Sequence, residues 1–332
     1  MNIAINGFGR IGRNFLRALL ADKKALQKIK VVAINIGPQN IDNVAHMFKY
    51  DTLMGTYSGS VVIQNNKLVI DDYKIDLISE VDPKKIHWKQ YNIEWVVESS
   101  GFFTTKEKAQ LHLDSGAQSV LISAPAKQED ITIIPGVNHK LFDKGKHKIV
   151  SLGSCTTNAF LPLLTIINNR FGIKSGFMTT IHSYTNTQVL IDTDHKDLRR
   201  SRAAALNIIP TTTGAAKMVE KVIPELTGKI GATSVRVPVA KVSLIDAALV
   251  LQNDVTKKQI EEALQLAAKN EMKNIVQLCY DELVSSDFSC NDHSVIVDMP
   301  FLDVRGSTVK IFGWYDNEWG YSVRLKDFLI SI

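Results

Sequence analysis

The chain begins with a short apolar segment that leads directly into a glycine-rich turn and then into a helical pattern. Residues 2–6 read NIAIN, which is typical of a buried strand. Gly7-x-Gly9-x-x-Gly12 follows, and the apolar residues of 13–21 recur at helical spacing. In this context the first glycine permits a tight turn, the second lets a pyrophosphate approach the backbone, and the third lets the helix pack on the strand. The chain is therefore predicted to open with a dinucleotide-binding strand–turn–helix unit.

The first half continues to alternate between apolar runs and helical patterns. Residues 105–116 read as a helix, and residues 61–78 as a hairpin with its turn at Asn65-Asn66. Alternation of this kind predicts a parallel sheet covered by helices. The further strands predicted here are residues 29–36, 95–97, 119–123 and 148–152.

After about residue 151 the pattern changes to long helices and alternating strands. Residues 183–203 are polar and without a period, so they predict a long ordered loop. We therefore predict an α/β protein with a Rossmann-type parallel sheet domain and an α+β catalytic domain whose sheet is mostly antiparallel. The helices predicted in this half are 155–171, 213–223, 257–269 and 318–332, and the strands are 177–182, 234–239, 242–251, 294–298 and 310–314.

Composition excludes several other classes of protein. A length of 332 residues suggests about two domains, and 45% hydrophobic with 22% charged residues disfavours disorder and coiled coil. The formal net charge of +5 is not concentrated in a stripe, so no specific nucleic-acid partner is predicted. Three cysteines make no disulfide framework, and the pair Cys290-x-x-His293 has no second pair with which to bind zinc. We expect a cytoplasmic protein without a metal or a membrane segment.

One cysteine and one histidine are candidate catalytic residues because of their positions in the sequence. Cys155 lies where a strand gives way to a helix, a position that stabilises a thiolate, and Ser154 and Thr156 offer hydroxyls beside it. His182 ends a predicted strand and is a candidate acid, base or ion-pair partner for that thiol. The alternative for both is structural, because a lone cysteine is more often a buried inert thiol.

The second half also supplies groups that bind anions. Arg236 differs from the rest because it interrupts an apolar strand between Val235 and Val237, whereas a solvated charge run accounts equally well for Arg199 and Arg200. The full set is Thr185, Lys196, Arg199, Arg200, Arg202, Thr213, Gly214 and Arg236.

Over essentially its whole length the sequence resembles the phosphorylating glyceraldehyde-3-phosphate dehydrogenase family. The segments that carry the resemblance are AINGFGRIGR at 4–13, ISAPAK at 122–127, SCTTN at 154–158, IHSYTN at 181–186, HKDLRR at 195–200, RAAA at 202–205, TGAAK at 213–217, VRVP at 235–238 and WYDNEWGYS at 314–322.

The resemblance implies a fold, a reaction and an assembly. Residues 1–151 would form the NAD-binding domain, with the helix of 317–332 docking back on it, and residues 152–316 the catalytic domain of a subunit in a homotetramer. The reaction would be the NAD-linked oxidation of D-glyceraldehyde 3-phosphate with inorganic phosphate to 1,3-bisphosphoglycerate, a step of glycolysis and gluconeogenesis. Cys155 would form the thiohemiacetal and then the thioester, and His182 would maintain the thiolate and take the hydroxyl proton.

The resemblance also implies the binding residues. Thr185 and Arg236 would bind the substrate phosphate, with Arg202 near the anions. Those that would bind the attacking phosphate are Ser154, Thr156, Thr213 and Gly214. Those that would contact the cofactor are Asn6, Gly7, Gly9, Arg10, Ile11, Gly12, Asn35, Ile36, Val81, Ser100, Ser123 and Asn317.

Departures from the family pattern leave the cofactor and the substrate open. Ile36 stands where NAD-using members carry an aspartate, Val81 replaces a common arginine, and Thr187 stands where many members have an aspartate. One hypothesis is that Asp194 of a neighbouring subunit replaces the missing acid at the ribose, which keeps NAD preferred over NADP. The alternatives are an NADP-linked gluconeogenic member of the family, an erythrose-4-phosphate dehydrogenase, and a thiol hydrolase that uses Cys155 and His182.

Overall fold

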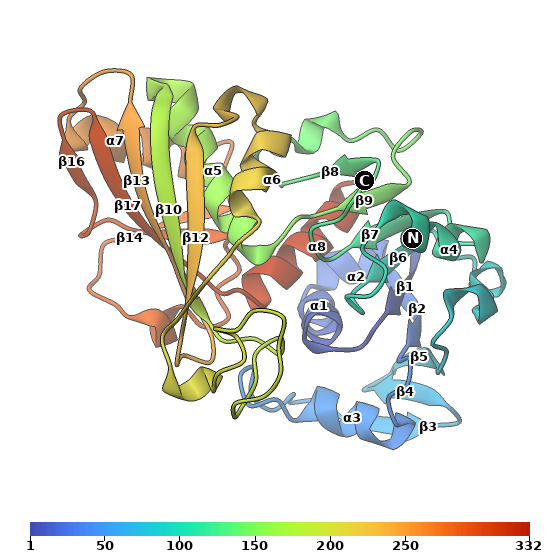
Figure 1. The fold of residues 1–332 in the computed structure, drawn as a ribbon. Coiled ribbons are helices and arrows are strands. Elements are labelled where there is room, and N and C mark those ends of the chain that lie inside the picture. The colour runs from blue at the N-terminus through green and yellow to red at the C-terminus, as the bar shows by residue number, and fades with distance from the viewer. The chain divides into compact units, whose positions relative to one another are not determined.

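The computed structural model describes all of residues 1–332 and divides them into two compact units (Figure 1). Unit 1 contains Met1–Ile133, Lys140–Gly153 and Ser322–Ile332, and unit 2 contains Ile134–His139 and Ser154–Tyr321. The chain thus passes from unit 1 to unit 2 at Gly153 and Ser154, and the last division falls inside the C-terminal helix α8 (Trp319–Ser331).

Unit 1 is built on a nine-stranded sheet in the order β3-β4-β5-β2-β1-β6-β7-β9-β8. Every neighbouring pair from β5 to β8 is parallel, whereas β3, β4 and β5 form an antiparallel meander. The strands are β1 (Asn2–Asn6), β2 (Lys30–Asn35), β3 (Val61–Gln64), β4 (Lys67–Ile70), β5 (Tyr73–Ile78), β6 (Trp95–Glu98), β7 (Ser119–Ile122), β8 (Ile131–Thr132) and β9 (Ile149–Ser151).

The central strands of this sheet are apolar because both of their faces are covered. Residues of β6, β7 and β9 are all buried, as a parallel sheet with helices on its faces requires. Phe328 of the C-terminal helix packs edge-on against Trp95 and Phe142, with ring centroids 5.8 and 5.2 Å away. The helices of unit 1 before α8 are α1 (Arg10–Leu20), α2 (Lys23–Lys28), α3 (Ile41–Lys49) and α4 (Lys106–Asp114).

Unit 2 is built on an eight-stranded sheet with the path β11-β12-β10-β13-β17-β15-β14, and β16 pairs with β17. Only the pairs β10–β12 and β14–β15 are parallel. The strands are β10 (Ile173–Ser183), β11 (Ile209–Thr211), β12 (Ile230–Val237), β13 (Ser243–Leu251), β14 (Val276–Cys279), β15 (Val295–Asp298), β16 (Asp303–Arg305) and β17 (Thr308–Tyr315).

One helix forms the centre of the core of unit 2. Helix α5 (Cys155–Phe171) buries most of its residues, and its apolar side chains pack with those of α6 (Ala215–Val222), α7 (Lys257–Lys269) and the inward face of the sheet. Strand β13 alternates buried and half-buried residues along its length, the pattern of a strand with one face on the core. No helix of the structure is both long and apolar enough to cross a membrane.

The predicted fold class is confirmed, and the differences are local. The bounds of α5 and α7 agree with the prediction, and residues 184–203 contain neither helix nor strand. The region 61–78 is a three-stranded meander, because Asp71 adopts a positive φ of 49° and starts a second turn after the one at Asn65-Asn66. Helix α3 was not predicted, since its apolar face consists of little more than Val44 and Phe48, four residues apart.

A buried carboxylate joins the carboxyl ends of three adjacent strands of unit 1. Glu98, at the end of β6, is 1% exposed, and its Oε2 accepts from the Asn6 amide nitrogen at 2.6 Å. Its Oε1 accepts from the backbone N–H and the hydroxyl of Ser100 at 2.8 and 2.5 Å. The Asn6 oxygen in turn accepts from Asn35 at 2.6 Å. The ends of β1, β2 and β6 are therefore held by one hydrogen-bond network.

A buried histidine also lies within hydrogen-bond distance of the Glu98 carboxylate. His112 of α4 is fully buried, its Nδ1 lies 3.1 Å from Trp88 Nε1, and its Nε2 lies 3.1 Å from Glu98 Oε2. An indole N–H only donates, so Nδ1 accepts and the ring proton lies on Nε2, where it can donate to Glu98. The chain Trp88–His112–Glu98 therefore orients the network at the strand ends.

Replacing Trp88 tests this chain of hydrogen bonds. We expect Trp88→Phe to lower the free energy of unfolding by about 1–3 kcal/mol, because it leaves a buried imidazole nitrogen without its donor. Trp319→Phe is the matched control, since its indole bonds Asp292 at an exposed site, and it should change stability by no more than about 0.5 kcal/mol. Denaturant unfolding measures both, and equal effects of the two variants would contradict the assignment.

Candidate active site

The thiol of Cys155 lies at the start of the longest helix in the chain. Cys155 is the first residue of α5, and Ser154 caps that helix. The Ser154 hydroxyl accepts from the Thr157 N–H at 3.2 Å, and the Thr157 hydroxyl accepts from the Ser154 N–H at 2.7 Å. The thiol therefore stands at the positive end of the helix dipole, which favours a negative charge there.

The imidazole of His182 faces this thiol from the end of a central strand. His182 is the penultimate residue of β10, is 4% exposed, and its Nε2 lies 3.7 Å from Cys155 Sγ. Strand β10 lies between β12 and β13, and the parallel register with β12 pairs His182 with Arg236. A helix start and two strand ends thus bring a thiol, an imidazole and a guanidinium together.

Two groups lie within hydrogen-bond distance of the second ring nitrogen of His182. Nδ1 is 2.7 Å from the Ser183 carbonyl oxygen and 2.6 Å from Arg236 Nη1. Arg236 Nη1 also donates to the Ser183 oxygen at 3.0 Å. Guanidinium nitrogens only donate, so Nδ1 accepts a hydrogen bond from Arg236, whereas it must carry a proton to donate to Ser183. The tautomer of His182 therefore depends on where Arg236 lies.

The surroundings favour neutral forms of both reactive groups. Burial, and then the charges of Arg236 and Arg200, lower the pKa of His182 to about 3, against a smaller opposing effect of the Ser183 carbonyl. Burial also raises the pKa of the Cys155 thiol, opposed by the Arg236 charge and by hydrogen bonds from Thr156. In this arrangement the pair is a thiol and a neutral imidazole near neutral pH.

A buried tyrosine contacts the residues around Cys155 and the ring of His182. Tyr315, the last residue of β17, is 1% exposed, and its hydroxyl lies 3.0 Å from Thr156 Oγ1 and 2.7 Å from Thr180 Oγ1. Its ring meets that of His182 edge-on, with centroids 5.9 Å apart. Burial raises the pKa of Tyr315, so it remains a neutral donor. Tyr315 thus links the first turn of α5 to the end of β10.

The amide of Asn317 has a defined orientation in unit 2. Its Oδ1 accepts from the hydroxyls of Ser183 and Ser243 at 2.9 and 3.2 Å. With the oxygen occupied in this way, the amide nitrogen remains to donate to a ligand. Asn317 is therefore prepared to hold a carbonyl oxygen such as that of a carboxamide.

In unit 1 the three glycines of the first turn differ in what surrounds them. A Cβ on Gly7 would lie 2.4 Å from the Ser100 backbone nitrogen, and one on Gly12 would lie 2.4 Å from the Gly7 oxygen. Gly9 has open space where a side chain would be, and it precedes the first turn of α1, which contains no acidic residue. Two glycines thus serve internal packing and the third leaves the helix start open, which fits a pyrophosphate.

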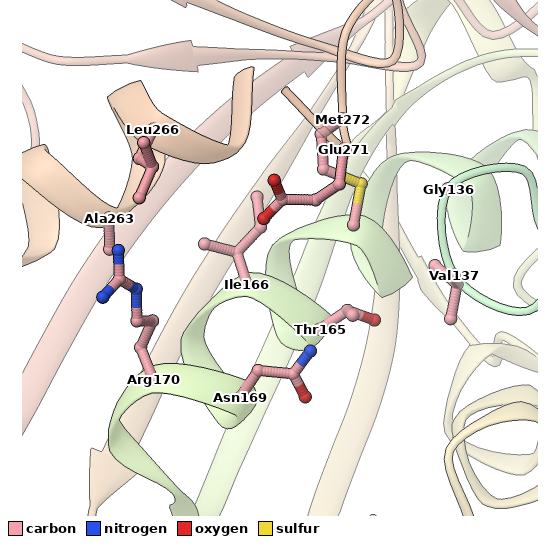
Figure 2. Close-up of a pocket in the computed structure, with 10 residues that line it drawn as sticks. All are labelled: Gly136, Val137, Thr165, Ile166, Asn169, Arg170, Ala263, Leu266, Glu271 and Met272. Carbon is pink, nitrogen blue, oxygen red and sulfur yellow. The ribbon is translucent and has the colours of Figure 1, made fainter. Parts of the chain in front are cut away.

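The cavity drawn in Figure 2 lies elsewhere in unit 2. It has a volume of about 210 Å³ and is lined by Thr165, Asn169 and Arg170 of α5, by Ala263 and Leu266 of α7, and by the segments around Val137 and Glu271. Thr165 follows Cys155 by ten residues, or about 15 Å along a helix. The cavity is also smaller than the roughly 300–1,000 Å³ usual for ligand pockets, so it is not the active site.

Comparison with known proteins decides the family. Residues 1–106 match the model described as "Glyceraldehyde 3-phosphate dehydrogenase, NAD binding domain", and residues 154–317 match the C-terminal domain of the same enzyme. The chain belongs to the glyceraldehyde-3-phosphate dehydrogenase family. It therefore carries that family's NAD-binding domain, as predicted.

Relatives of this family match along nearly the whole chain. "Glyceraldehyde-3-phosphate dehydrogenase 2" of Bacillus subtilis is 44% identical over 330 residues, covering 99% of this chain and 96% of the relative. "Glyceraldehyde-3-phosphate dehydrogenase 1" of Bacillus cereus is 47% identical over 326 residues, covering 98% and 96%. The enzyme of Geobacillus stearothermophilus is 44% identical over 328 residues, again covering 98% and 96%.

The structure does not gather all of the anion-binding residues expected from the glyceraldehyde-3-phosphate dehydrogenase resemblance. Arg202 is exposed and forms an ion pair with Asp192. Arg200 instead donates from Nε to Thr211 Oγ1 at 2.9 Å, and its charge lowers the pKa values of both His182 and Arg236. Arg200 is thus the arginine of the loop whose charge acts on His182 and Arg236; from the sequence it was an anion-binding candidate that a solvated charge run explained equally well.

Several of the expected phosphate ligands already have structural hydrogen bonds. The Ser154 hydroxyl caps α5, and the Thr156 hydroxyl bonds Tyr315. Thr213 Oγ1 accepts from the Ala215 N–H at 3.3 Å, and Gly214 precedes the first turn of α6. Thr185 Oγ1 lies 2.9 Å from Thr187 Oγ1. Backbone amides at the starts of α5 and α6 therefore add to these hydroxyls as donors to an anion.

The expected cofactor residues of unit 1 also differ in their surroundings. Arg10 forms an ion pair with Asp51, and the Ser123 hydroxyl donates to the Glu98 carbonyl oxygen at 2.9 Å. Ile36 is 1% exposed, so its side chain packs inside unit 1, whereas Val81 is 70% exposed. Asn6, Asn35 and Ser100 belong to the network of Glu98, a residue that the sequence analysis did not single out.

The glycines of the first turn provide a matched pair of variants. Gly7→Ala should lower the melting temperature of the cofactor-free protein, because Gly7 has a φ of +90° and its new Cβ would meet backbone atoms. Gly9→Ala should melt like the wild type and yet bind NAD several-fold more weakly, because its Cβ enters the open space. Thermal melting and calorimetric NAD titration test this. Unchanged NAD binding in Gly9→Ala would contradict the assignment of the open helix start as the pyrophosphate site.

The pH dependence of stability tests the state of His182. Its pKa is 6.5 when unperturbed and about 3 in the fold, so between these values the unfolded chain binds a proton that the native state does not. Stability contributed by the neutral ring is therefore lost as the pH falls. Relative to His182→Asn, the wild type should lose about 1.4 kcal/mol of unfolding free energy per pH unit between about pH 6 and 4. Parallel stability curves for the two proteins would contradict this.

Proposed function

We propose that this protein oxidises D-glyceraldehyde 3-phosphate to 1,3-bisphosphoglycerate with NAD and inorganic phosphate. The observation that carries the proposal is the 3.7 Å approach of Cys155 Sγ to His182 Nε2 at the start of a capped helix, in a chain of this family. A thiol, an adjacent base and nearby cationic groups are the parts that covalent aldehyde oxidation needs.

In the proposed reaction Cys155 is the nucleophile. Its sulfur bonds to the carbonyl carbon of the aldehyde, while the thiol proton passes through His182 to the carbonyl oxygen and gives the thiohemiacetal hydroxyl. The developing oxyanion is stabilised by amides at the start of α5 and by the imidazole edge. His182 Nε2 takes the proton of the thiohemiacetal hydroxyl as the carbon is oxidised. Bound NAD supplies the hydride acceptor. Inorganic phosphate then bonds to the thioester carbonyl carbon, and Cys155 leaves as the thiolate.

The remaining residues bind and orient. Arg236 and Thr185 hold the phosphate of the substrate, and Ser154, Thr156, Thr213 and Gly214 hold the attacking phosphate, with Arg200 adding its charge to that region in place of Arg202. Asn317 donates its amide nitrogen to the carboxamide of the cofactor, which its bonds to Ser183 and Ser243 support. Glu98 orients Ser100 and Asn6 beside the glycine turn, which supports their place among the cofactor contacts.

We also propose that the protein acts as a cytoplasmic homotetramer. Large apolar side chains of β10 and of the segment that follows it, in residues 177–208, are exposed in the single chain, and a partner subunit would cover them. The most exposed are Leu190 (86%), Leu198 (83%), Leu206 (81%), Ile191 (78%) and Phe177 (75%). The three cysteines are all free thiols, which fits a reducing compartment.

A steady-state assay that crosses the two nicotinamide cofactors with and without phosphate tests the function. We expect reduced NAD to form only with D-glyceraldehyde 3-phosphate and inorganic phosphate together, and NADP to be the poorer cofactor. Turnover that does not require phosphate would favour the erythrose-4-phosphate enzyme, and equal or better use of NADP would favour an NADP-linked enzyme. Aldehyde-independent hydrolysis without cofactor reduction would favour the thiol hydrolase.

Two cysteine variants locate the nucleophile. Cys155→Ser should lower turnover at least about 10⁴-fold, because an alcohol beside a neutral imidazole is a far weaker nucleophile than a thiol. Cys290→Ser is the matched control: Cys290 is exposed and forms no disulfide, and a serine oxygen can still accept from Lys241 Nζ, which lies 3.1 Å from the Cys290 sulfur, so this variant should keep wild-type turnover. Substantial activity of Cys155→Ser in the same assay would remove Cys155 from the mechanism.

A further inference from the structure

The hydrogen bond from Arg236 to His182 conflicts with the role of His182 as a base. With Arg236 Nη1 2.6 Å away and donating, Nδ1 has no proton, so the neutral ring carries its proton on Nε2. That N–H faces Cys155 Sγ at 3.7 Å. In this tautomer Nε2 has no lone pair with which to take a proton from the thiol or from a thiohemiacetal hydroxyl.

The same geometry contains the arrangement that base catalysis needs. The Ser183 carbonyl oxygen lies 2.7 Å from Nδ1, close enough to accept a proton placed there. Nε2 would then present its lone pair to the sulfur. The only group that opposes this arrangement directly is Arg236, which donates both to Nδ1 and to the Ser183 oxygen.

Arg236 takes this position with no carboxylate to pair with. Its buried Nε has no hydrogen-bond partner. The charged and titratable groups that act on it come from α5, β17 and the loop before β11, and these are Cys155, Tyr315 and Arg200. Around His182 the same three elements contribute Cys155, Arg200 and the ring of Tyr315, and β12 contributes Arg236. Because no anion is beside it, the Arg236 guanidinium donates to His182 Nδ1 and to the Ser183 oxygen.

We propose that the phosphate of the substrate releases His182 for catalysis by drawing the Arg236 guanidinium away from Nδ1. This inference rests on the proposed role of Arg236 as a ligand of that phosphate. The phosphate oxygens accept the Nη hydrogens, Nδ1 becomes free to donate to the Ser183 oxygen, and Nε2 becomes an acceptor. A proton leaves Nε2 for solvent and another is taken up at Nδ1, so the exchange is balanced. Nε2 can then accept the Cys155 proton, which gives an imidazolium and a thiolate.

One consequence is that the phosphate contributes to rate as well as to binding. An aldehyde without phosphate would meet an imidazole in the tautomer that cannot accept a proton. It should therefore show a low kcat even at saturation, and not merely a high KM. Arg236 would act in this way as a positioning residue for His182 as well as a substrate ligand.

The sign of a pKa change distinguishes this coupling from simple electrostatics. A bound phosphate dianion close to Cys155 would by charge repulsion raise the pKa of the thiol. Release of His182 has the opposite effect, because Nε2 becomes able to take the thiol proton. The probe is glycerol 3-phosphate, a phosphate monoester without a carbonyl group. The readout is the ultraviolet absorbance of the Cys155 thiolate, corrected with Cys155→Ser for the other two cysteines.

We expect glycerol 3-phosphate to shift the thiolate titration of the wild type down by about one pH unit or more, a tenfold change in the proton equilibrium. In His182→Asn the ligand should shift it upward or leave it unchanged, because only the charge effect remains. Arg305→Gln, at an exposed position of β16 where the arginine pairs with Asp303, is the matched control for Arg236→Gln and should behave as the wild type, whereas Arg236→Gln should lose the downward shift.

Three results would overturn the proposal. These are an upward or absent shift in the wild type with calorimetrically confirmed binding, the same downward shift in His182→Asn, and no binding of the probe at all. If any of these results is found and the wild type is still an active, phosphate-dependent dehydrogenase, the coupling alone is wrong. If it has no such activity, the proposed function fails independently.

Discussion

The contact between a helix start and a strand end determines the chemistry of unit 2. Cys155 can face His182 only because α5 begins at residue 155 and β10 ends just after residue 182, with both elements packed into one core. The Ser154 cap fixes where the helix starts, and the bonds of Tyr315 to Thr156 and Thr180 tie that start to β10. These supporting contacts involve side chains that do not react, and yet they set the 3.7 Å separation on which reactivity depends.

Both units contain a buried charged or titratable group at the carboxyl ends of their strands, but the two groups differ in their hydrogen-bond partners. In unit 1 Glu98 is surrounded by donors from Asn6, Ser100 and His112, so its hydrogen-bonding needs are met within the fold. In unit 2 Arg236 has a free Nε and no carboxylate partner, and it donates to the nitrogen of a proposed catalytic base. A satisfied group positions a binding surface, whereas an unsatisfied one remains responsive to an anion.

The parts of the fold and of the site that could be predicted from the sequence are those that depend on consecutive residues. The apolar spacing of α5 and the polar residues before Cys155 predicted both its extent and the position of the thiol, and the end of an apolar strand located His182. The glycine turn predicted a dinucleotide-binding unit, and the resemblance implied the NAD-binding domain of the family, which the family match confirms.

The parts that could not be predicted depend on residues far apart in the chain. Tyr315 meets Thr156 across 159 residues, and Asn6 meets Glu98 across 92. Such pairs leave no periodic signal, although the position of Tyr315 inside the WYDNEWGYS segment was a clue. Arg200 and Arg202 look alike in the sequence, and only the folded loop distinguishes the one whose charge acts on His182 from the one paired with Asp192.

A single-turnover experiment tests the proposed covalent role of Cys155 most directly. Rapid mixing of the enzyme with D-glyceraldehyde 3-phosphate and NAD in the absence of inorganic phosphate should produce one equivalent of reduced NAD per subunit and then stop. Mass spectrometry of the quenched protein should find the phosphoglyceryl group on the peptide that contains Cys155. Continued turnover without phosphate, or an acyl group on any other residue, would contradict the account.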